Sequence, residues 1–133
     1  MNNRRAWIIA ITMVVTFVVI RSMMQLSPDS DFNVGRYNIH HLFTGLLLIT
    51  AGGIPVALFP RNSLVTDAMA AVFGAGLSLA LDEWVYLIAT DGSNASYLLP
   101  VSLRGGMVMV GLAVAYVAIL YMISRDKQPP FNP

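Results

Sequence analysis

Four long apolar stretches are the feature of this sequence that most limits its possible folds. They cover about residues 6–26, 39–59, 68–89 and 103–123. Each is close to the ~20 residues that an α-helix needs to cross the hydrocarbon core of a bilayer. A transmembrane β-barrel would instead show alternating segments of about 10 residues. We therefore predict an all-α membrane protein, one domain over residues 1–133, whose four transmembrane helices form an up-down bundle in the lipid bilayer.

The composition agrees with a membrane protein and excludes other classes. Of the 133 residues, 56% are hydrophobic and 11% are charged, whereas charged residues make up about 25% of a typical soluble domain. The net charge of +1 is too small for the basic surface of a nucleic-acid-binding protein, so nucleic acid is excluded as a partner. The absence of cysteine excludes disulfides, thiolate metal ligands and a cysteine nucleophile.

The distribution of basic residues predicts the topology. If the N-terminus is inside, the outer segments hold three arginines, whereas the inner segments hold five basic residues: Arg4, Arg5, Arg61, Arg125 and Lys127. Because Lys and Arg are enriched in cytoplasmic segments, we expect both termini in the cytoplasm. Residues 27–38 and 90–102 then lie outside.

A stripe of small and polar residues follows one face of the third predicted helix. It consists of Asp67, Ala71, Gly74, Ser78 and Asp82, which are spaced by three or four residues. Residues at this spacing share one face of a helix. Small side chains let another backbone approach closely inside a membrane, so the stripe predicts a helix-packing face.

Aromatic side chains stand near the ends of the predicted spans. They are Trp7, Tyr37, Trp84 and Tyr97. Because Trp and Tyr favour the level of the lipid headgroups, we expect these four rings at the membrane interfaces.

Two pairs of ionisable residues interrupt the apolar spans. His40 and His41 open the second span, and Asp82 and Glu83 lie inside the third. An ionised group at membrane depth costs about 2.5 to 3.5 kcal/mol on insertion scales, so such groups are retained when they are paired, hydrated or functional. If the two spans are antiparallel about a turn near Ser63, all four groups fall within about one helical turn of each other, ~5.4 Å.

The two histidines are neighbours in the sequence, as are the two carboxylates, and this limits which side chains can share one site. Neighbouring residues on a helix diverge by about 100°, so His40 and His41 cannot both face one atom. The same holds for Asp82 and Glu83. We expect one member of each pair to dominate any shared site.

A metal site is one hypothesis for this layer. Two imidazoles and two carboxylates form a nitrogen and oxygen ligand set that suits one divalent ion, Zn, Mn or Fe. The ligands would be His40, His41, Asp82 and Glu83. The spacing matches neither the Glu-x-x-His pair of di-iron bundles nor the His-Glu-x-x-His pattern of zinc proteases.

A network of ion pairs is the alternative. Arg21 reaches the depth of the two carboxylates, and Arg104 lies about one turn higher on the fourth span. A buried network of both arginines with Asp82 and Glu83 would neutralise the charges without a metal. A proton or substrate path is a third interpretation of the layer.

Three strings carry a resemblance to a known group of proteins. They are NIHHLFTG at residues 38–45, GAGLSLALDEW at 74–84 and DGSNASYLLPVS at 91–102. Over about residues 36–110 the chain resembles small, uncharacterised bacterial integral membrane proteins that pair an IHH-x-x-x-G helix start with an LDE helix end. The resemblance implies a bacterial inner-membrane protein with the group's histidines, glycine and carboxylates at His40, His41, Gly45, Asp82 and Glu83. It implies no activity.

Three functional hypotheses follow. The first is a small, non-catalytic polytopic inner-membrane protein whose outward-facing His/Asp/Glu layer binds a divalent metal. The second is an accessory structural subunit that packs against other membrane subunits, or a homo-oligomer, with the polar layer as a salt-bridge network. The third is a metal-dependent membrane enzyme, which lacks the third histidine of many catalytic zinc sites. The sequence assigns no catalytic residue.

Overall fold

The computed structural model describes residues 3–27, 33–34, 37–38, 40–59 and 63–126. Within them the order of elements is α1 (Asn3–Leu26), β1 (Asn33–Val34), β2 (Tyr37–Asn38), α2 (His41–Leu58), α3 (Leu64–Ala89), α4 (Asn94–Tyr97) and α5 (Pro100–Asp126). The four long helices α1, α2, α3 and α5 are long and apolar enough to cross a membrane. The predicted all-α fold with four spans is confirmed, and the chain fits a multi-pass membrane protein.

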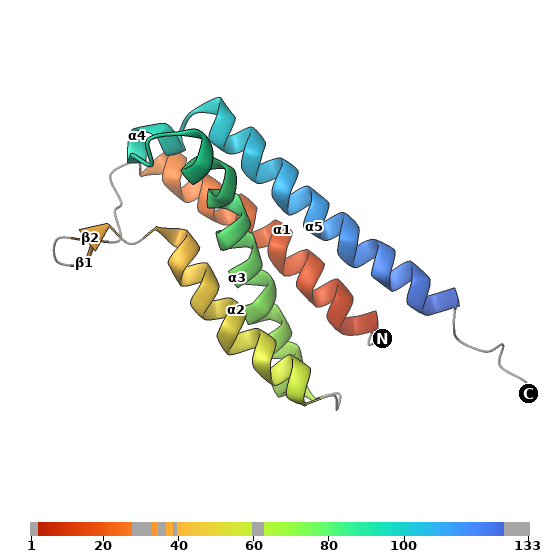
Figure 1. The fold of residues 1–133 in the computed structure, drawn as a ribbon. Coiled ribbons are helices and arrows are strands. Elements are labelled where there is room, and N and C mark those ends of the chain that lie inside the picture. The colour runs from red at the N-terminus through yellow and green to blue at the C-terminus, as the bar shows by residue number, and fades with distance from the viewer. Residues whose placement is uncertain (1–2, 28–32, 35–36, 39, 60–62, 127–133) are drawn as a thin grey trace, which may run out of the picture.

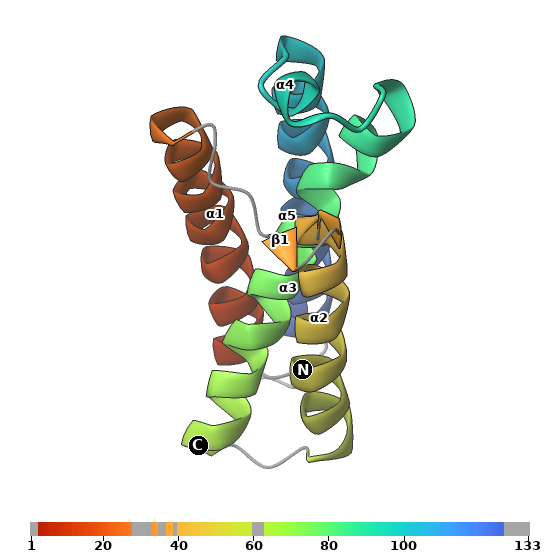
Figure 2. The same ribbon diagram turned by 90° about the vertical axis from the view of Figure 1, so that its left-hand side faces the viewer.

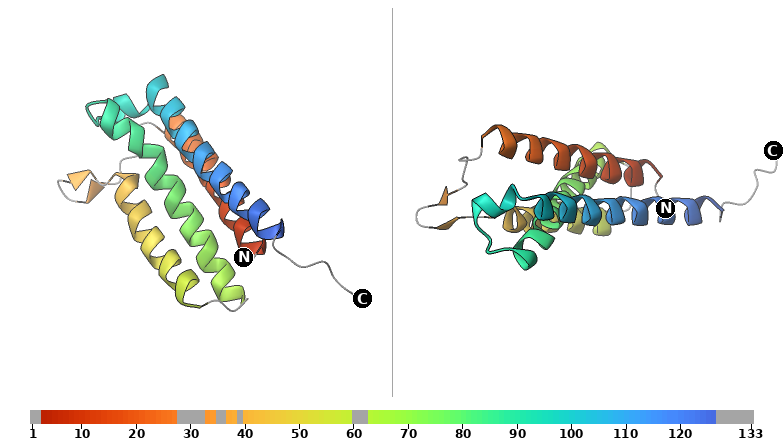
Figure 3. Two further views of the ribbon diagram at one scale, coloured as in Figure 1. Left: turned by 45° about the vertical axis from the view of Figure 1, so that its right-hand side comes forward. Right: turned by 90° about the horizontal axis from the view of Figure 1, so that it is seen from above.

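The long helices alternate in direction, and α3 occupies the centre. The start of α1 and the end of α5 lie at the same end of the bundle (Figure 1). α3 packs against α1, α2 and α5, and α1 also touches α5. Within the described part of the chain, α2 packs against no long helix other than α3. Figure 3 accordingly shows α3 between α2 on one side and α1 with α5 on the other, and Figure 2 shows α1 and α2 on opposite sides of α3.

The small-residue stripe of α3 is a packing face against α1. A Cβ added to Gly74 would lie 2.8 Å from the carbonyl oxygen of Ile9, so only glycine permits this approach of the two helices. One turn further along, the Ser78 hydroxyl donates a hydrogen bond to the carbonyl of Met13 at 2.8 Å. The packing role predicted for the stripe is therefore confirmed.

Glycines also bring α2 and α3 into backbone contact. A Cβ on Gly45 would lie 2.7 Å from both the amide nitrogen of Ala80 and the carbonyl oxygen of Gly76. A Cβ on Gly76 would in turn lie 2.6 Å from the amide nitrogen of Ile49. Close backbone packing is a main source of helix association in lipid, because lipid tails compete equally for apolar side chains.

α1 and α3 end at the predicted residues, Leu26 and Ala89, and the other helix limits lie one to four residues from the predicted ones. α3 starts at Leu64 because Ser63 caps it: the Ser63 hydroxyl accepts from the Thr66 amide, and the Thr66 hydroxyl accepts from the Ser63 amide. α5 starts at Pro100, whose fixed φ suits the first helical position. The β1–β2 hairpin pairs Asn33 with Asn38 and Val34 with Tyr37. Together with α4, it lies in connections for which the sequence predicted no element.

Gly74→Leu tests the packing face between α1 and α3. The added side chain would force the two backbones apart, so we expect the free energy of unfolding to fall by about 1–3 kcal/mol. Thermal unfolding in detergent measures the loss. Gly111→Leu on α5 is the matched control, because a Cβ there meets no atom within 4 Å. Equal melting temperatures for the two variants would contradict the role of the stripe.

Candidate functional site

The candidate site is a buried polar cluster around Asp82, where α1, α3 and α5 meet beneath α4. Asp82 is 0% exposed. Its Oδ1 accepts from the Arg21 Nε at 2.7 Å and lies 2.6 Å from the Arg21 Nη2. Its Oδ2 accepts a hydrogen bond from the Tyr97 hydroxyl. Both carboxylate oxygens of Asp82 are therefore occupied by groups of the same chain.

The remaining donors of Arg21 connect α1 to α4 and α5. The Nη1 donates to the carbonyl of Tyr97 at 3.1 Å, and the Nη2 donates to the carbonyl and the hydroxyl of Ser102, each at 3.1 Å. The guanidinium also lies over the Tyr97 ring, 4.1 Å from its centroid. One arginine side chain on α1 thus contacts α3, the end of α4 and the first turn of α5.

Small residues on α5 make room for this cluster. Ser102 and Gly106 are one turn apart and share the α5 face toward α3. A Cβ on Gly106 would collide with the Asp82 Oδ1 and would lie 3.1 Å from the Arg21 Nη2. The absence of a side chain at Gly106 is therefore required for the Arg21–Asp82 contact.

A structured loop holds Tyr97 over the cluster. The Asp91 carboxylate accepts hydrogen bonds from the Ser96 hydroxyl, from the Ser93 amide at 3.0 Å and from the Ser93 hydroxyl at 2.8 Å. These bonds, led by the one from Ser96, lower the pKa of Asp91 to about 2. Gly92 supplies the positive φ of +72° that the turn needs.

Burial, and then the Asp82 charge, raise the pKa of the Tyr97 hydroxyl, so Tyr97 stays a hydrogen-bond donor.

Glu83 contacts the start of α2 and not the cluster around Asp82. Its Oε2 accepts from the Leu42 amide at 2.7 Å, in the first turn of α2, and its Oε1 lies 3.6 Å from the His40 Nδ1. A carboxylate at this position interacts favourably with the positive end of the α2 dipole. His40, at the N-cap position of α2, makes no side-chain capping bond of its own. Glu83 therefore caps α2 from the neighbouring helix.

The structure divides the four predicted ligands between two places. Glu83 lies beside His40, whereas Asp82 lies beside Arg21 and the His41 ring lies 6.3 Å from the Tyr97 ring. In the described part of the chain, no group of three or more His, Asp or Glu side chains is placed to hold a metal ion. The adjacent side chains of Asp82 and Glu83 point to different neighbours, as expected. The metal site with four ligands stays a prediction.

The predicted ion-pair network is right for Arg21 and wrong for Arg104. Arg21 pairs with Asp82 as expected, whereas Glu83 lies beside His40 and, among the described residues, makes no ion pair with either arginine. The Arg104 side chain is exposed, and among the described residues it makes no ion pair with either carboxylate. Arg104 is two residues from both Ser102 and Gly106, which is about 200° around α5, so it faces away from the cluster.

Tyr97 and Ser102 are the cluster residues that the sequence analysis did not identify. Tyr97, which the sequence analysis places at a membrane interface, is only 2% exposed and lies inside the cluster. Trp7 and Trp84 are exposed, and the Tyr37 side chain lies outside the described residues. The position of these rings at the membrane interfaces stays a prediction. The small pair Ser102 and Gly106 is the sequence signal that could have indicated a contact on this face of α5.

A second polar cluster joins α1 and α3 at the opposite end of the bundle. The Arg5 Nη2 donates to the Thr66 hydroxyl at 2.8 Å. The Asp67 carboxylate lies 3.1 Å from the Arg4 Nη2 and 3.9 Å from the Arg5 Nε. Arg5 and Thr66 are 61 residues apart, as are Arg21 and Asp82. The two parallel helices therefore keep one register from end to end.

Comparisons with protein-family models, with curated proteins and with solved structures gave no match. The resemblance to small bacterial membrane proteins therefore stays a prediction from the quoted strings.

Asp82→Asn tests whether the buried ion pair holds the bundle together. Removal of the carboxylate charge leaves the Arg21 guanidinium buried with less compensation, so we expect a loss of about 3–5 kcal/mol in the free energy of unfolding. His41→Ala is the comparison variant, with an expected loss within about 1 kcal/mol. Unfolding in detergent measures both.

Together with the single variants Arg21→Met and Asp82→Leu, the double variant Arg21→Met with Asp82→Leu forms a mutant cycle. Because it removes both charges, we expect it to unfold at a higher temperature than Asp82→Asn. A double variant as unstable as the sum of the single changes would show that the two side chains are not coupled.

Proposed function

We propose that this protein is a small, non-catalytic polytopic membrane protein that acts as an accessory structural subunit of a membrane complex. The observation that carries the proposal is that the buried Arg21–Asp82 pair finds its hydrogen-bonding partners within this chain. Asp82 and Arg21 are buried, and groups on α1, α3, α4 and α5 occupy their hydrogen-bonding atoms. A charge pair in this state fixes helices in place and offers no free group for chemistry. The proposal assigns no catalytic residue.

Most of the exposed surface belongs to the apolar helices, which supports a role that depends on contacts inside the bilayer. The connections between the long helices are short, covering residues 27–40, 59–63 and 90–99. Large apolar side chains cover the outward faces, among them Leu47, Leu58 and Ile88. A partner chain would therefore meet mainly the lipid-facing sides of the helices.

The proposal also places the protein in a bacterial inner membrane, with both termini in the cytoplasm.

A divalent metal at the start of α2 is the second candidate. It is favoured by one observation, the 3.6 Å distance between the His40 Nδ1 and the Glu83 Oε1. An imidazole and a carboxylate are ligands that Zn, Mn and Fe accept. His41 is the adjacent residue with a third donor, and Asp82 would have to leave Arg21 to contribute.

The subunit proposal predicts a second polypeptide in native-lipid particles. Extraction from the source membrane without detergent, followed by native mass measurement, should give a mass well above the 14.5 kDa of one chain. A photo-crosslinker at outward-facing Leu47 should label another protein, whereas one at buried Leu79 should not. A single chain carrying only lipid would contradict the proposal. Integer multiples of one chain would replace it with a homo-oligomer.

The metal candidate predicts a chelator effect. The purified protein should contain about one metal ion per chain, and a chelator should lower its melting temperature, because binding to the folded state alone adds stability. His40→Ala and Glu83→Gln should lose the ion, and Arg104→Gln should keep it. Wild-type protein without stoichiometric metal, and with no response to the chelator, would exclude this candidate.

A further inference from the structure

Arg104 lies in the wall of an open hollow between α5 and α3. The hollow has a volume of about 400 Å³, and Val85, Val101, Gly105 and Val108 form the rest of its wall. Val101, Arg104 and Val108 share one face of α5, because they are spaced by three and four residues. A Cβ on Gly105 would collide with the Val85 side chain, so α5 packs tightly on α3 directly beside this face. The hollow therefore combines apolar walls with one arginine.

The Arg104 charge is not neutralised by any residue that the structure describes. Its side chain is exposed, and within the described ranges it makes no hydrogen bond, ion pair or ring contact. Arg5 and Arg21, in contrast, lie beside the carboxylates of Asp67 and Asp82. The Arg104 guanidinium is thus available to an anion from outside the chain.

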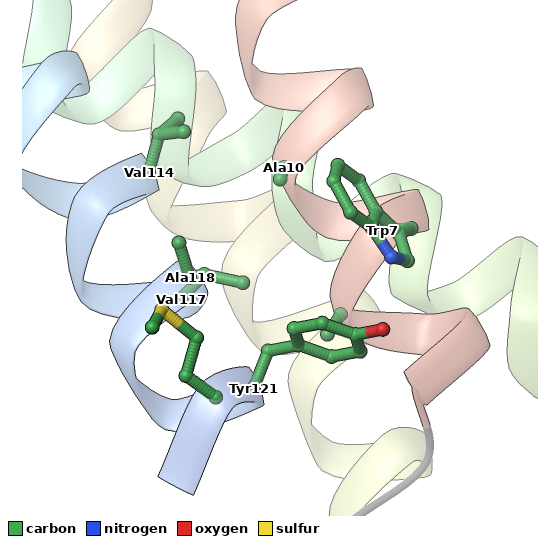
Figure 4. Close-up of a pocket in the computed structure, with 8 residues that line it drawn as sticks. Trp7, Ala10, Val114, Val117, Ala118 and Tyr121 are labelled. Carbon is green, nitrogen blue, oxygen red and sulfur yellow. The ribbon is translucent and has the colours of Figure 1, made fainter. Parts of the chain in front are cut away.

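Three other hollows lie between α1 and α5, and they indicate no particular ligand. Trp7 and Tyr121 line the first (Figure 4), Arg5 belongs to the second, and Gly111 belongs to the third. The described walls of the first and third are uncharged, and Arg5 in the second already donates to the Thr66 hydroxyl. Apolar surface alone does not distinguish a lipid tail from an apolar helix, so only the Arg104 hollow carries a specific ligand chemistry.

The position of Arg104 along α5 puts it at the level of the lipid headgroups. Residues 105–124 carry no charge, and Arg125 follows them. About 20 residues of helix span ~30 Å, the thickness of the hydrocarbon core, so the two arginines mark its two boundaries. The Cα–Cβ bonds of a helix lean toward its N-terminus, and α5 begins at Pro100. The Arg104 side chain therefore leaves the backbone in the direction of the nearer membrane surface.

We propose that Arg104 and the hollow beside it bind one anionic phospholipid, whose phosphate interacts with the guanidinium and whose acyl chain packs on Val85 and Val108. A guanidinium can donate two parallel hydrogen bonds to a phosphate, and basic pockets beside transmembrane helices bind anionic headgroups. A carboxylate on a partner's span would have to leave water at a cost to reach the hollow, whereas lipid phosphates already lie at this level. The inference does not depend on the proposed subunit role.

Lipid titration of the purified full chain tests the proposal. The protein in a neutral detergent is titrated with dioleoylphosphatidylglycerol or with dioleoylphosphatidylcholine, and native mass measurement counts the lipids that stay bound. We expect one retained phosphatidylglycerol per chain, with an affinity about fivefold above that for phosphatidylcholine, the ratio that one arginine supplies. Equal affinity for the two lipids would overturn the proposal. Stronger displacement of the lipid by inorganic phosphate than by chloride at equal ionic strength would also overturn it, because the site would then need no acyl chain.

Arg104→Gln tests the headgroup contact. It should lower the phosphatidylglycerol affinity about fivefold, to the level of phosphatidylcholine. Arg4→Gln is the matched control and should leave the preference unchanged, because Arg4 is also exposed but lies beside Asp67 at the opposite end of the bundle. Equal losses in the two variants would show a general attraction between charges and would overturn the site.

Val108→Trp tests the hollow itself. The larger side chain should occupy the hollow and remove the retained phosphatidylglycerol, whereas Leu112→Trp, one turn further along the exposed side of α5 and outside the hollow, should not. Normal retention by a folded Val108→Trp variant would contradict the proposal.

Native-lipid particles of the Arg104→Gln variant separate the lipid from a protein partner. We expect the variant to keep any polypeptide that accompanies the wild-type chain. Loss of that polypeptide with unchanged lipid affinity would assign Arg104 to a partner chain and overturn the lipid site. Because subunit partners and lipid affinity are measured separately, the two proposals can fail independently.

Discussion

The ion pair between Arg21 and Asp82 is the interaction on which the arrangement of the helices depends. A charge inside a membrane span is costly unless its partners are present, and a guanidinium carries five N–H donors that need acceptors. In this protein the acceptors are the Asp82 carboxylate, the Tyr97 carbonyl and the carbonyl and hydroxyl of Ser102. Because these groups come from α3, α4 and α5, satisfying one side chain of α1 fixes four segments relative to each other.

The same principle acts at the other end of α1, where Arg5 binds Thr66 and faces Asp67. Between the two polar ends, α1 and α3 meet through Gly74 and through the Ser78 hydroxyl. This alternation of polar contacts and small residues suits a lipid environment, in which apolar side chains gain little by leaving the lipid. The register of α1 on α3 therefore follows from hydrogen bonds and close packing.

Two adjacent carboxylates connect α3 to different neighbours. Asp82 faces α1 and α5, whereas Glu83 faces α2 and caps its first turn. The step of about 100° between neighbouring helical residues makes this division possible. The same step separates Asp82 from Glu83, which the metal hypothesis would combine in one site. The division favours a structural role for the buried Asp82 with Arg21.

The sequence alone determined the four spans, the packing stripe of α3 and the shared depth of Arg21 and Asp82. These features depend on local apolar runs and on helical periodicity, which are properties of short segments. The tertiary structure decided which carboxylate each basic group meets, why Arg104 faces away and why Tyr97 is buried. Those outcomes depend on the rotation of each helix about its axis and on the path of the Asp91–Leu99 loop. Contacts between segments far apart in the chain set both, and a single sequence carries no direct record of such contacts.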